Sequence, residues 1–579
     1  MTSPPATLAT GRVQRVNGPV VDVVGLNGVA MFDVVAIGDA GMAGEIVSIN
    51  GDVATAQVYE YDGGVAPGDP VTSRREPLSI TLGPGLLGHV FDGILRPLDP
   101  AVVWLASGRA DTASMEARWH FTPAATVGDP MTPGVLLGHV IEGAHFEHRV
   151  LVPPGVEGPL TVLAPESDAR ADEPIARIGN VDIAMSHRWP VRAPRPARGR
   201  DREARLLRTG QRVLDLLYPI VRGSSASVPG GFGTGKTILQ QQIAKWCDAE
   251  VIVYVGCGER GNEMIDVLED LARLEDPRTG GPLRERTICI ANTSNMPVMA
   301  REASIYTGVA VAEYFRDMGY DVVVIADSTS RWAEALREFA SRTNQLPAEE
   351  GYPATLASAL AAFYERAGSF TTLGGGRGSV TIIGAVSPPG GDLTEPVTAQ
   401  TRRFVRCVWS LDRDLAYARH YPAVSWNESF SRDSDAIASV RSEGGDTEWA
   451  ERRAVALSLL AEAERLESLV ELVGAAALPD RQRVTLRSAK LLKESVLQQD
   501  STSENDAYCG EAKQQAILEM VLAIHQRFLE LVARGVAADT LERLDLTRVS
   551  AAREGGGADD VSAVIAVRDS ALALLETLG

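Results

Sequence analysis

The chain has 579 residues, of which 45% are hydrophobic and 23% are charged, and its formal net charge is −20. This length exceeds a single hydrophobic core and predicts roughly three or four domains. The acidic charge repels phosphates and argues against a protein whose main partner is nucleic acid, and no apolar run reaches the roughly 18 residues of a membrane-spanning helix.

The N-terminal third predicts two β-rich domains and no signal peptide, so we expect a cytoplasmic protein. Residues 1–74 contain strand-like runs such as MFDVVAIG and GEIVSI between Gly, Asp and Asn turns, a pattern typical of a small antiparallel barrel or sandwich. Residues 75–110 are expected to form a crossover. Residues 111–192 return to strands and turns, and the segment from residue 128 onward resembles the β modules that carry biotin or lipoate. The hairpin VPPGVEGP lacks the attachment lysine, so we expect no prosthetic group.

The remainder of the chain predicts an α/β domain followed by helices. Residues 193–435 start with a Pro- and Arg-rich linker and then alternate strands with helical stretches, which favours a parallel sheet. Residues 436–579 are mostly helical. Within 453–473 an apolar stripe at helical spacing predicts the core face of a bundle helix, formed by Leu457, Leu460, Leu466, Leu469 and Val473. The five cysteines form no CxxC pair, which is typical of a reducing compartment without disulfides or a zinc site.

A phosphate-binding loop is predicted at residues 230–237, where GGFGTGKT fits the pattern G-x-x-x-x-G-K-[ST]. Glycines let several backbone N–H groups converge on phosphate oxygens, and the helix that follows adds the positive end of its dipole. We expect Lys236 to reach the terminal phosphates of ATP or ADP and the Thr237 hydroxyl to bind Mg²⁺. A chance match is the alternative, but the loop lies between strand-like sequence and an amphipathic helix. The predicted loop contacts are Gly230, Gly231, Phe232, Gly233, Thr234, Gly235, Lys236, Thr237 and Ile238.

A second element supports the loop. DVVVIADSTSR, residues 321–331, is an apolar strand that ends in Asp327, as a Walker B strand does. Its carboxylate is expected to hold Mg²⁺ through water. A strand-end Asp is often only a helix cap, but the phosphate loop upstream favours the metal role.

Charged residues also follow the strand-like run AEVIVYV, in GCGERGNEM at residues 256–264. In doubly wound sheets ligands bind at the carboxyl ends of the strands. Glu259 is therefore predicted to polarise the attacking water, Arg260 to neutralise phosphate charge, and Glu263 to hold Arg260 or a metal-bound water. The alternative is that Glu259 and Arg260 only form a solvated turn. The phosphate loop elsewhere in the sequence favours the catalytic interpretation.

These motifs, with ANTSNMPVMAREASIYTG, PAEEGYPATLASALAAFYERAG and LPDRQRVTL, resemble the catalytic A subunit of the V-type and archaeal-type (A-type) rotary ATPases over roughly residues 10–510. The resemblance implies a multidomain fold: an N-terminal β-barrel, a β-rich bulge domain, a central RecA-like P-loop α/β domain and a C-terminal helical bundle. It implies an ATP phosphohydrolase and synthase that couples ATP to H⁺ or Na⁺ transport.

The same resemblance implies partners and further contacts. Three such chains would alternate with three noncatalytic B subunits, each supplying an arginine finger in trans, around a central rotor stalk and beside peripheral stalks. The chain would meet the membrane only through the ion-translocating sector, on its cytoplasmic face, and would bind no nucleic acid. Arg331 matches an arginine near the phosphates, and Tyr421 an aromatic residue beside the adenine, although a core tyrosine is the alternative.

Three positions depart from the family pattern. Gly231 stands where proline is usual, Thr502 where a phenylalanine usually packs on adenine, and Ser425 where Asn or Asp is preferred. Losing the proline restraint costs about 0.5–1 kcal/mol of loop ordering, and losing the aromatic contact costs about 0.5–1.5 kcal/mol. The departures bear on nucleotide affinity and base selectivity, not on the chemistry.

Three other classes of function share this core. A hexameric nucleic-acid translocase needs a basic face with stacking aromatics, which the charge of −20 and the aromatic content of 6% oppose. An export ATPase would lack the bulge domain. A nucleotide-binding protein without turnover is opposed by the presence of both Lys236 and Glu259.

Overall fold

The computed structural model describes residues 8–59, 64–98, 117–143, 145–343 and 345–578. The chain divides into two compact units. The first unit is formed by Met1–Arg202, Ala249–Val386 and Thr394–Phe404, and the second by Glu203–Asp248, Ser387–Leu393 and Val405–Gly579. Part of the predicted crossover at 75–110 and the start of the predicted domain at 111–192 fall outside the described residues.

The first unit begins with a closed barrel, as predicted for an antiparallel N-terminal domain. Its strands pair in the order β1-β2-β5-β4-β3-β6. Side chains alternate along them, so that Val21, Val35, Ile37 and Ile46 fill the barrel while their neighbours face outward. The strands are β1 Ala9–Asn17, β2 Val20–Val24, β3 Asp33–Ile37, β4 Met42–Asn50, β5 Val53–Val58 and β6 Pro70–Pro77.

The second β-rich domain of this unit consists of two four-stranded sheets, in the orders β10-β13-β15-β16 and β12-β11-β9-β14. Phe121, Leu137, Val140 and Ile178 belong to one apolar cluster between them. The strands are β9 Arg118–Pro123, β10 Pro130–Met131, β11 Leu136–Glu142, β12 Phe146–Leu151, β13 Gly158–Leu163, β14 Ser167–Arg170, β15 Pro174–Ile178 and β16 Val181–Ala184. We call this the bulge domain.

A parallel sheet forms the rest of the first unit. Its strands run in the order β26 (Arg377–Val386), β24 (Asp321–Asp327), β22 (Val251–Cys257), β23 (Thr287–Asn292), with the short β8 (Val90–Phe91) at one edge. The central strands β22 and β24 are buried along their whole length, which explains their continuous apolar sequence. Helix α4 (Val298–Asp317) packs against β22, β23, β24 and β26. The other helices of this unit are α3 Gly261–Arg273, α5 Thr329–Arg342, α6 Leu356–Tyr364 and α7 Pro396–Phe404. Four short strands belong to it as well. Strand β7 (Ser79–Leu82) pairs with β17 (His187–Pro190), and β25 (Gly368–Thr371) pairs with both β18 (Gly199–Arg200) and β26.

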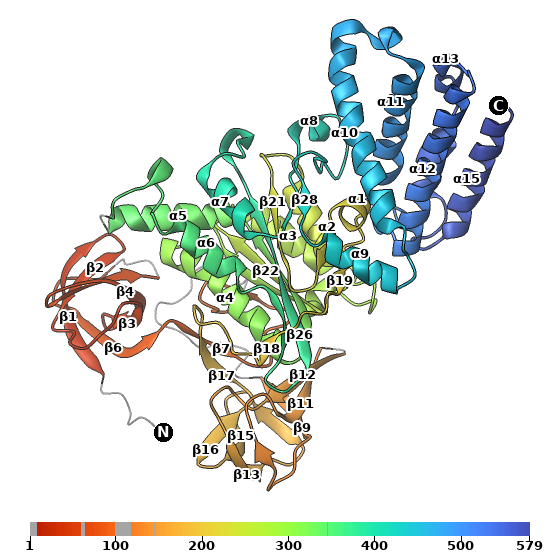
Figure 1. The fold of residues 1–579 in the computed structure, drawn as a ribbon. Coiled ribbons are helices and arrows are strands. Elements are labelled where there is room, and N and C mark those ends of the chain that lie inside the picture. The colour runs from red at the N-terminus through yellow and green to blue at the C-terminus, as the bar shows by residue number, and fades with distance from the viewer. Residues whose placement is uncertain (1–7, 60–63, 99–116, 144, 344, 579) are drawn as a thin grey trace. The chain divides into compact units, whose positions relative to one another are not determined.

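The second unit combines the segment around the phosphate loop with the C-terminal helices. Strand β21 (Ser225–Pro229) leads into helix α2 (Lys236–Trp246) and pairs in parallel with β27 (Cys407–Val408). The other short elements are β19 Leu206–Leu207, α1 Arg212–Leu217, β20 Ile220–Val221, α8 Arg413–Tyr417, β28 Phe430–Ser431 and α9 Ser434–Glu443. The helical part is α10 Trp449–Val473, α11 Asp480–Leu492, α12 Glu511–Ala533, α13 Ala538–Glu542, α14 Thr547–Ala551 and α15 Val561–Glu576, with α11 and α15 both packed on α12 (Figure 1). The predicted combination of barrel, bulge domain, P-loop α/β domain and helical bundle is confirmed.

The predicted apolar stripe in α10 is wrong in its second half. The buried residues of α10 are Trp449, Ala456, Leu459, Leu460, Ala463 and Leu466. Leu469 is 39% and Val473 55% exposed, because they lie in the last turns before the α10–α11 connection, where helical cover ends. Among the described residues, no helix is long and apolar enough to cross a membrane.

Candidate active site

The phosphate loop connects a buried strand to a helix, as its sequence predicts. β21 is buried at every position, and α2 begins at Lys236. Gly233 and Gly235 have φ of 79° and 88°, in the left-handed region that side chains rarely adopt. This backbone path turns the chain sharply, so that the first turn of α2 leaves its N–H groups at the loop.

Lys236 lies across this loop. Its Nζ donates hydrogen bonds to the carbonyls of Gly230 at 2.7 Å and Gly231 at 2.9 Å. The Thr234 hydroxyl, which is buried, donates to the Gly231 carbonyl at 2.9 Å. Thr237 occupies the second position of α2 and is half-buried. The ammonium therefore stands at the loop where phosphate oxygens would be received.

The outer loop residues are open to solvent. Phe232 is 87% and Ile238 55% exposed. Arg413, at the start of α8, lies close to the loop at Gly231. A Cβ placed on Gly231 would lie 3.2 Å from the Nη2 atom of Arg413. Sequence reasoning missed Arg413, since no motif marks it.

Tyr421 lies beside the start of α2. A Cβ placed on Gly235 would be 3.6 Å from its ring, and the residue is 42% exposed. This is the environment of an aromatic surface open to a ligand rather than of a core tyrosine. Thr502 is exposed, and its hydroxyl donates to Asp500 Oδ1 at 2.7 Å. Ser425 is buried, and its hydroxyl accepts from the Glu428 N–H at 3.3 Å.

The predicted carboxylates lie in the first unit, at the carboxyl ends of neighbouring strands. Gly256 of β22 pairs with Asp327 of β24, so both strands end at the same level. Asp327 is buried and accepts a hydrogen bond from the Tyr254 hydroxyl at 3.2 Å. Glu259 follows Gly258, and its carbonyl accepts from the Ser294 N–H at 2.9 Å.

The turn between β22 and Glu259 requires glycine at position 258. Its φ is 75°, and a Cβ there would lie 2.8 Å from the Cβ of Arg331. Arg331 itself binds Glu334 through Nη1, at 2.9 and 3.2 Å. The turn therefore brings Glu259 and Arg331 to the same edge of the sheet.

The electrostatic environment of Glu259 differs from that of a surface carboxylate. Its pKa is raised from 4.5 to about 7, first by burial, then by the charge of Asp327 and a hydrogen bond with Glu263, while Arg331 opposes the shift. Glu263 lies in the first turn of α3, where the helix dipole favours an acid. A carboxyl group with this pKa exchanges a proton readily near neutral pH.

The two other arginines of this cluster differ in burial. Arg260 is exposed and lies 3.8 Å from Glu263, a weak surface pair. Arg301 is buried, donates from Nη2 to the Ser294 carbonyl at 2.8 Å, and packs against Gly258. Sequence reasoning missed Arg301. Its position in the first turn of α4, after a strand that ends beside β22, was the signal that would have found it.

The structure thus assembles two groups of predicted residues. Glu259, Glu263, Asp327 and Arg331 gather in the first unit, and the phosphate loop and Tyr421 in the second. The roles of all these residues, and their action on one nucleotide, stay predictions. Within the described residues no three His, Cys, Asp or Glu side chains form a metal cage. The hard oxygens of Thr237 and Asp327 suit Mg²⁺, which takes most of its ligands from water and phosphates.

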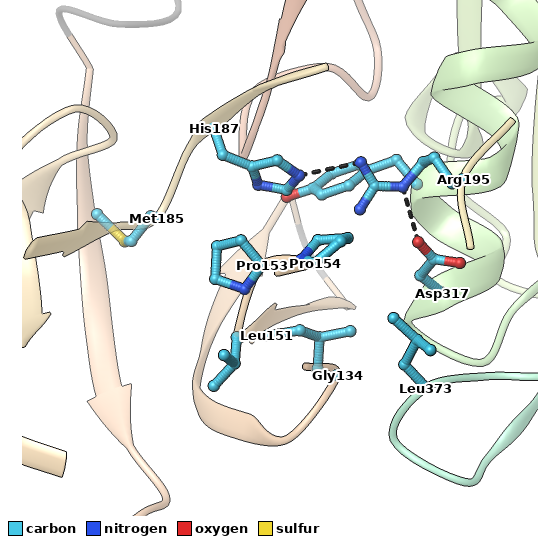
Figure 2. A pocket seen from close by; sticks show the side chains of 11 residues that line it. Gly134, Leu151, Pro153, Pro154, Met185, His187, Arg195, Asp317 and Leu373 are labelled. Carbon is cyan, nitrogen blue, oxygen red and sulfur yellow. Dashed lines mark hydrogen bonds and ion pairs between the residues drawn. The ribbon is translucent and has the colours of Figure 1, made fainter. Parts of the chain in front are cut away.

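A cavity elsewhere in the first unit is not part of this site. It lies between the bulge domain and the end of α4, and Figure 2 shows His187, Arg195 and Asp317 around it. Arg195 donates to His187 Nε2 at 3.0 Å and to Asp317 at 2.7 Å. Burial and the charge of Arg195 lower the pKa of His187 to about 3. These groups satisfy one another, and none of the predicted site residues lines the cavity.

Comparison with known proteins matches four successive segments of the chain. Residues 13–74 match the β-barrel domain of the ATP synthase alpha/beta family, and residues 110–192 match the family's barrel-sandwich domain. Residues 210–431 match the family's nucleotide-binding domain. Residues 441–541 match the C-terminal domain of V and A type ATP synthases.

Whole proteins from other organisms are similar over nearly their full length. The A subunit of the A-type ATP synthase of Desulfurococcus sp. (strain SY) is 49% identical over 546 residues, covering 92% of this chain and 93% of the relative. The V-type ATP synthase alpha chain of Nitrosococcus oceani is 51% identical over 545 residues, covering 92% of both. Among solved structures, the ATPase EscN of the enteropathogenic E. coli type III secretion system has a TM-score of 0.62 at 20% identity, covering 88% of this chain and 99% of EscN. That likeness concerns the fold alone.

Proposed function

The chain belongs to the ATP synthase alpha/beta family, among the A subunits of A-type and V-type ATP synthases, and we propose that Lys236 and Glu259 act together on one MgATP. The protein is the catalytic subunit of an ion-transporting ATPase that hydrolyses or makes ATP. The residue roles below rest on the geometry within each unit.

The phosphate loop and Lys236 hold the phosphates. N–H groups at the start of α2 and the Lys236 ammonium, which now bridges two loop carbonyls, would exchange these partners for phosphate oxygens. Thr237 and Asp327 would hold Mg²⁺, which neutralises phosphate charge when bound. Asp327 is kept in place by its burial and by the Tyr254 hydroxyl.

Glu259 would act on the water. A carboxyl group with a pKa of about 7 can take a proton from an attacking water in hydrolysis and return it in synthesis. Arg331 and Arg260 would neutralise charge on the phosphate oxygens. The geometry favours Arg331, because it packs at Gly258, over Arg260, which is exposed. Arg301, buried beside the same glycine, joins them as a candidate.

The protein would work in a larger assembly. We propose the A₃B₃ arrangement, in which a noncatalytic B subunit supplies an arginine finger in trans and a central rotor stalk and peripheral stalks complete the complex. The chain would lie on the cytoplasmic face of the membrane and meet it only through the ion-translocating sector. It would bind no nucleic acid, as the net charge of −20 favours.

The observation that carries the catalytic role is the environment of Glu259 beside Asp327 and Arg331. The test is ATP hydrolysis by the reconstituted complex carrying Glu259→Gln. Losing the base should lower turnover by about 10²–10⁴-fold. The matched control is Glu338→Gln, which removes an exposed carboxylate paired with Arg342 on α5 and should leave turnover unchanged. Wild-type turnover in Glu259→Gln would contradict the proposal, and purification of the chain with RNA instead of a B-like chain would favour a translocase.

A further inference from the structure

Tyr421 is tied to a buried glutamine far along the chain. The backbone N–H of Gln499 donates to the Tyr421 carbonyl at 2.8 Å. The Gln499 side chain is buried, and its Nε2 donates to the Gly210 carbonyl at 2.9 Å. Its Oε1 accepts the N–H of Arg212 at 2.8 Å. Gln499 therefore joins the Tyr421 loop to the segment that precedes the phosphate loop.

A buried ion pair holds the residues on either side of Gln499. Arg212 and Asp506 are both fully buried and lie 2.5 Å apart. Arg212 also donates to the carbonyl of Gln498 at 2.6 Å. Asp506 accepts the N–H of Asp500 at 2.7 Å with its other oxygen. Gln498, Gln499 and Asp500 are thus each fixed by a separate hydrogen bond.

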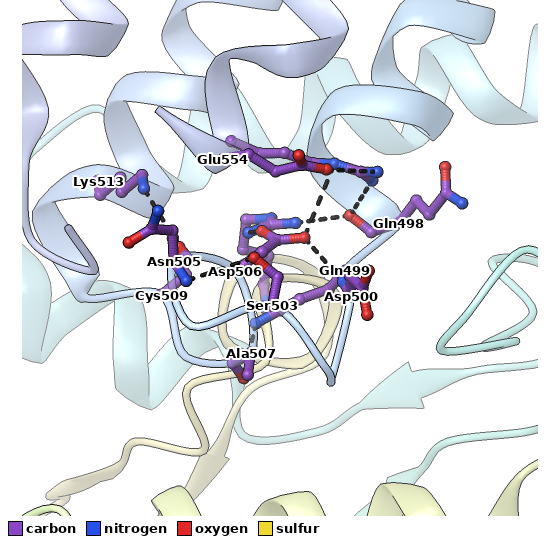
Figure 3. A network of polar contacts seen from close by, with 12 residues as sticks. Gln498, Gln499, Asp500, Ser503, Asn505, Asp506, Ala507, Cys509, Lys513 and Glu554 are labelled. Carbon is purple, nitrogen blue, oxygen red and sulfur yellow. Dashed lines mark hydrogen bonds and ion pairs between the residues drawn. The ribbon is translucent and has the colours of Figure 1, made fainter. Parts of the chain in front are cut away.

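This network extends to the C-terminal helices, as Figure 3 shows around Asp506 and Gln499. Arg553 donates to the carbonyls of Glu494 at 3.0 Å and Gln498 at 2.9 Å. Lys513 of α12 donates to the carbonyls of Gly557 at 3.0 Å and Gly555 at 3.2 Å. The loop that carries Thr502 is therefore held by the helical part of the second unit.

A buried charge pair needs a reason, because packed apolar side chains often stabilise a fold as well or better. A polar network offers something apolar packing does not, since each donor fixes one acceptor in one direction. The groups fixed here are backbone atoms of the consecutive residues 498–500. The Gln499 N–H binds the Tyr421 carbonyl, and the Asp500 carboxylate accepts hydrogen bonds from the N–H and the hydroxyl of the exposed Thr502. Tyr421 and Thr502 occupy the two positions that the family resemblance places beside the adenine.

We propose that Gln499, Arg212 and Asp506 are positioning residues for the base end of the nucleotide site. They hold the backbone at Tyr421 and the Thr502 loop in place before a nucleotide binds, so that less ordering is needed on binding. This inference rests on the proposed function, because it needs a nucleotide bound at the phosphate loop.

The experiment compares a ligand that has a base with one that has none. Calorimetry on the full chain gives the Kd of MgATP and of inorganic tripolyphosphate for wild type and Gln499→Leu. The variant should bind MgATP about 5- to 10-fold more weakly, the effect of one or two lost hydrogen bonds, and tripolyphosphate equally well. Asp506→Asn, nearly identical in shape, repeats the test where Gln499→Leu folds poorly. Val484→Ala, a core change in α11, should lower the melting temperature and leave both Kd values unchanged.

The outcomes separate the inference from its premise. A wild-type chain that binds neither ligand overturns the proposed function, and the inference with it. A wild-type chain that binds MgATP, with variants that bind it equally well, overturns the inference alone. Equal weakening of MgATP and tripolyphosphate also overturns it, because the network would then act on the phosphate loop or on the whole fold.

Discussion

The phosphate loop lies in one unit and the Glu259 cluster in the other, and the two are built differently. The loop is local: a buried strand, two left-handed glycines and the first turn of α2 all lie within residues 225–239. The environment of Glu259 draws on residues as distant as Asp327 and Arg331. Motifs mark the residues of both regions, but the electrostatic environment of Glu259 is set only by the folded sheet.

The difference separates two functions that mutations can measure apart. On the proposed roles, local backbone groups and Lys236 would hold the phosphates, so their loss should appear in binding. Glu259 would move a proton, so its loss should appear in turnover and in the pH dependence of stability.

The largest expected effect is on binding. Lys236→Ala should raise the Kd of MgATP by about 100-fold or more, because the proposed charge-assisted contact of its ammonium with the phosphates would be lost. Glu259→Gln should keep the Kd within about threefold of wild type while turnover falls. Calorimetry on the full chain measures both. Lys245→Ala is the matched control. This lysine lies on the same helix over the Trp246 ring, and its loss should leave the Kd of MgATP unchanged. Equal affinity in Lys236→Ala and wild type would break the comparison.

An intermediate effect is expected on stability. The folded pKa of Glu259 is about 7 against 4.5 for an unperturbed glutamate, so the folded chain binds more protons between these values. Its free energy of unfolding should therefore fall as pH rises from about 4.5 to 7, and then stay level. Glu259→Gln removes this cost and should stabilise the chain by about 1–2 kcal/mol at pH 8 but not at pH 4.

Melting temperatures of wild type and Glu259→Gln at acid and alkaline pH test this sign. The exposed Glu338→Gln should show no such pH-dependent gain. A larger gain at low pH than at high pH would show that Glu259 is held as a carboxylate, and would contradict its description as a group that exchanges protons near neutrality.

The smallest expected effect concerns the base. Thr502→Phe would place an aromatic ring at an exposed position whose hydroxyl now only binds Asp500. It should tighten MgATP binding by about 0.5–1.5 kcal/mol, and leave tripolyphosphate binding unchanged. Ser501→Phe, at the exposed neighbouring position, is the control. Equal tightening by both variants would indicate a general apolar effect.

The fold was predictable where the sequence pattern is continuous or periodic. The buried strands β22 and β24, the barrel and the phosphate loop follow from apolar runs, alternation and glycine spacing. The extent of the apolar stripe in α10 was not predictable. Leu469 and Val473 continue its helical spacing, but both side chains are exposed. Periodicity reports which face is apolar, not how far a neighbouring helix extends.

The candidate site divides in the same way. Lys236, Glu259 and Asp327 stand at strand ends or helix starts, which a sequence shows. Arg413 carries no such signal, because its approach to Gly231 depends on chain segments brought together only by folding. The raised pKa of Glu259 could not be read from the sequence for the same reason.

The most direct test of the central claim is a structure of the assembled complex with Mg²⁺, ADP and aluminium fluoride, which mimics the phosphate during transfer. The account predicts Lys236 Nζ within about 3 Å of a phosphate or fluoride atom, and the Glu259 carboxylate within about 3 Å of a water aligned for attack. A Glu259 carboxyl group that stays bonded to Glu263, with no room for that water, would contradict it.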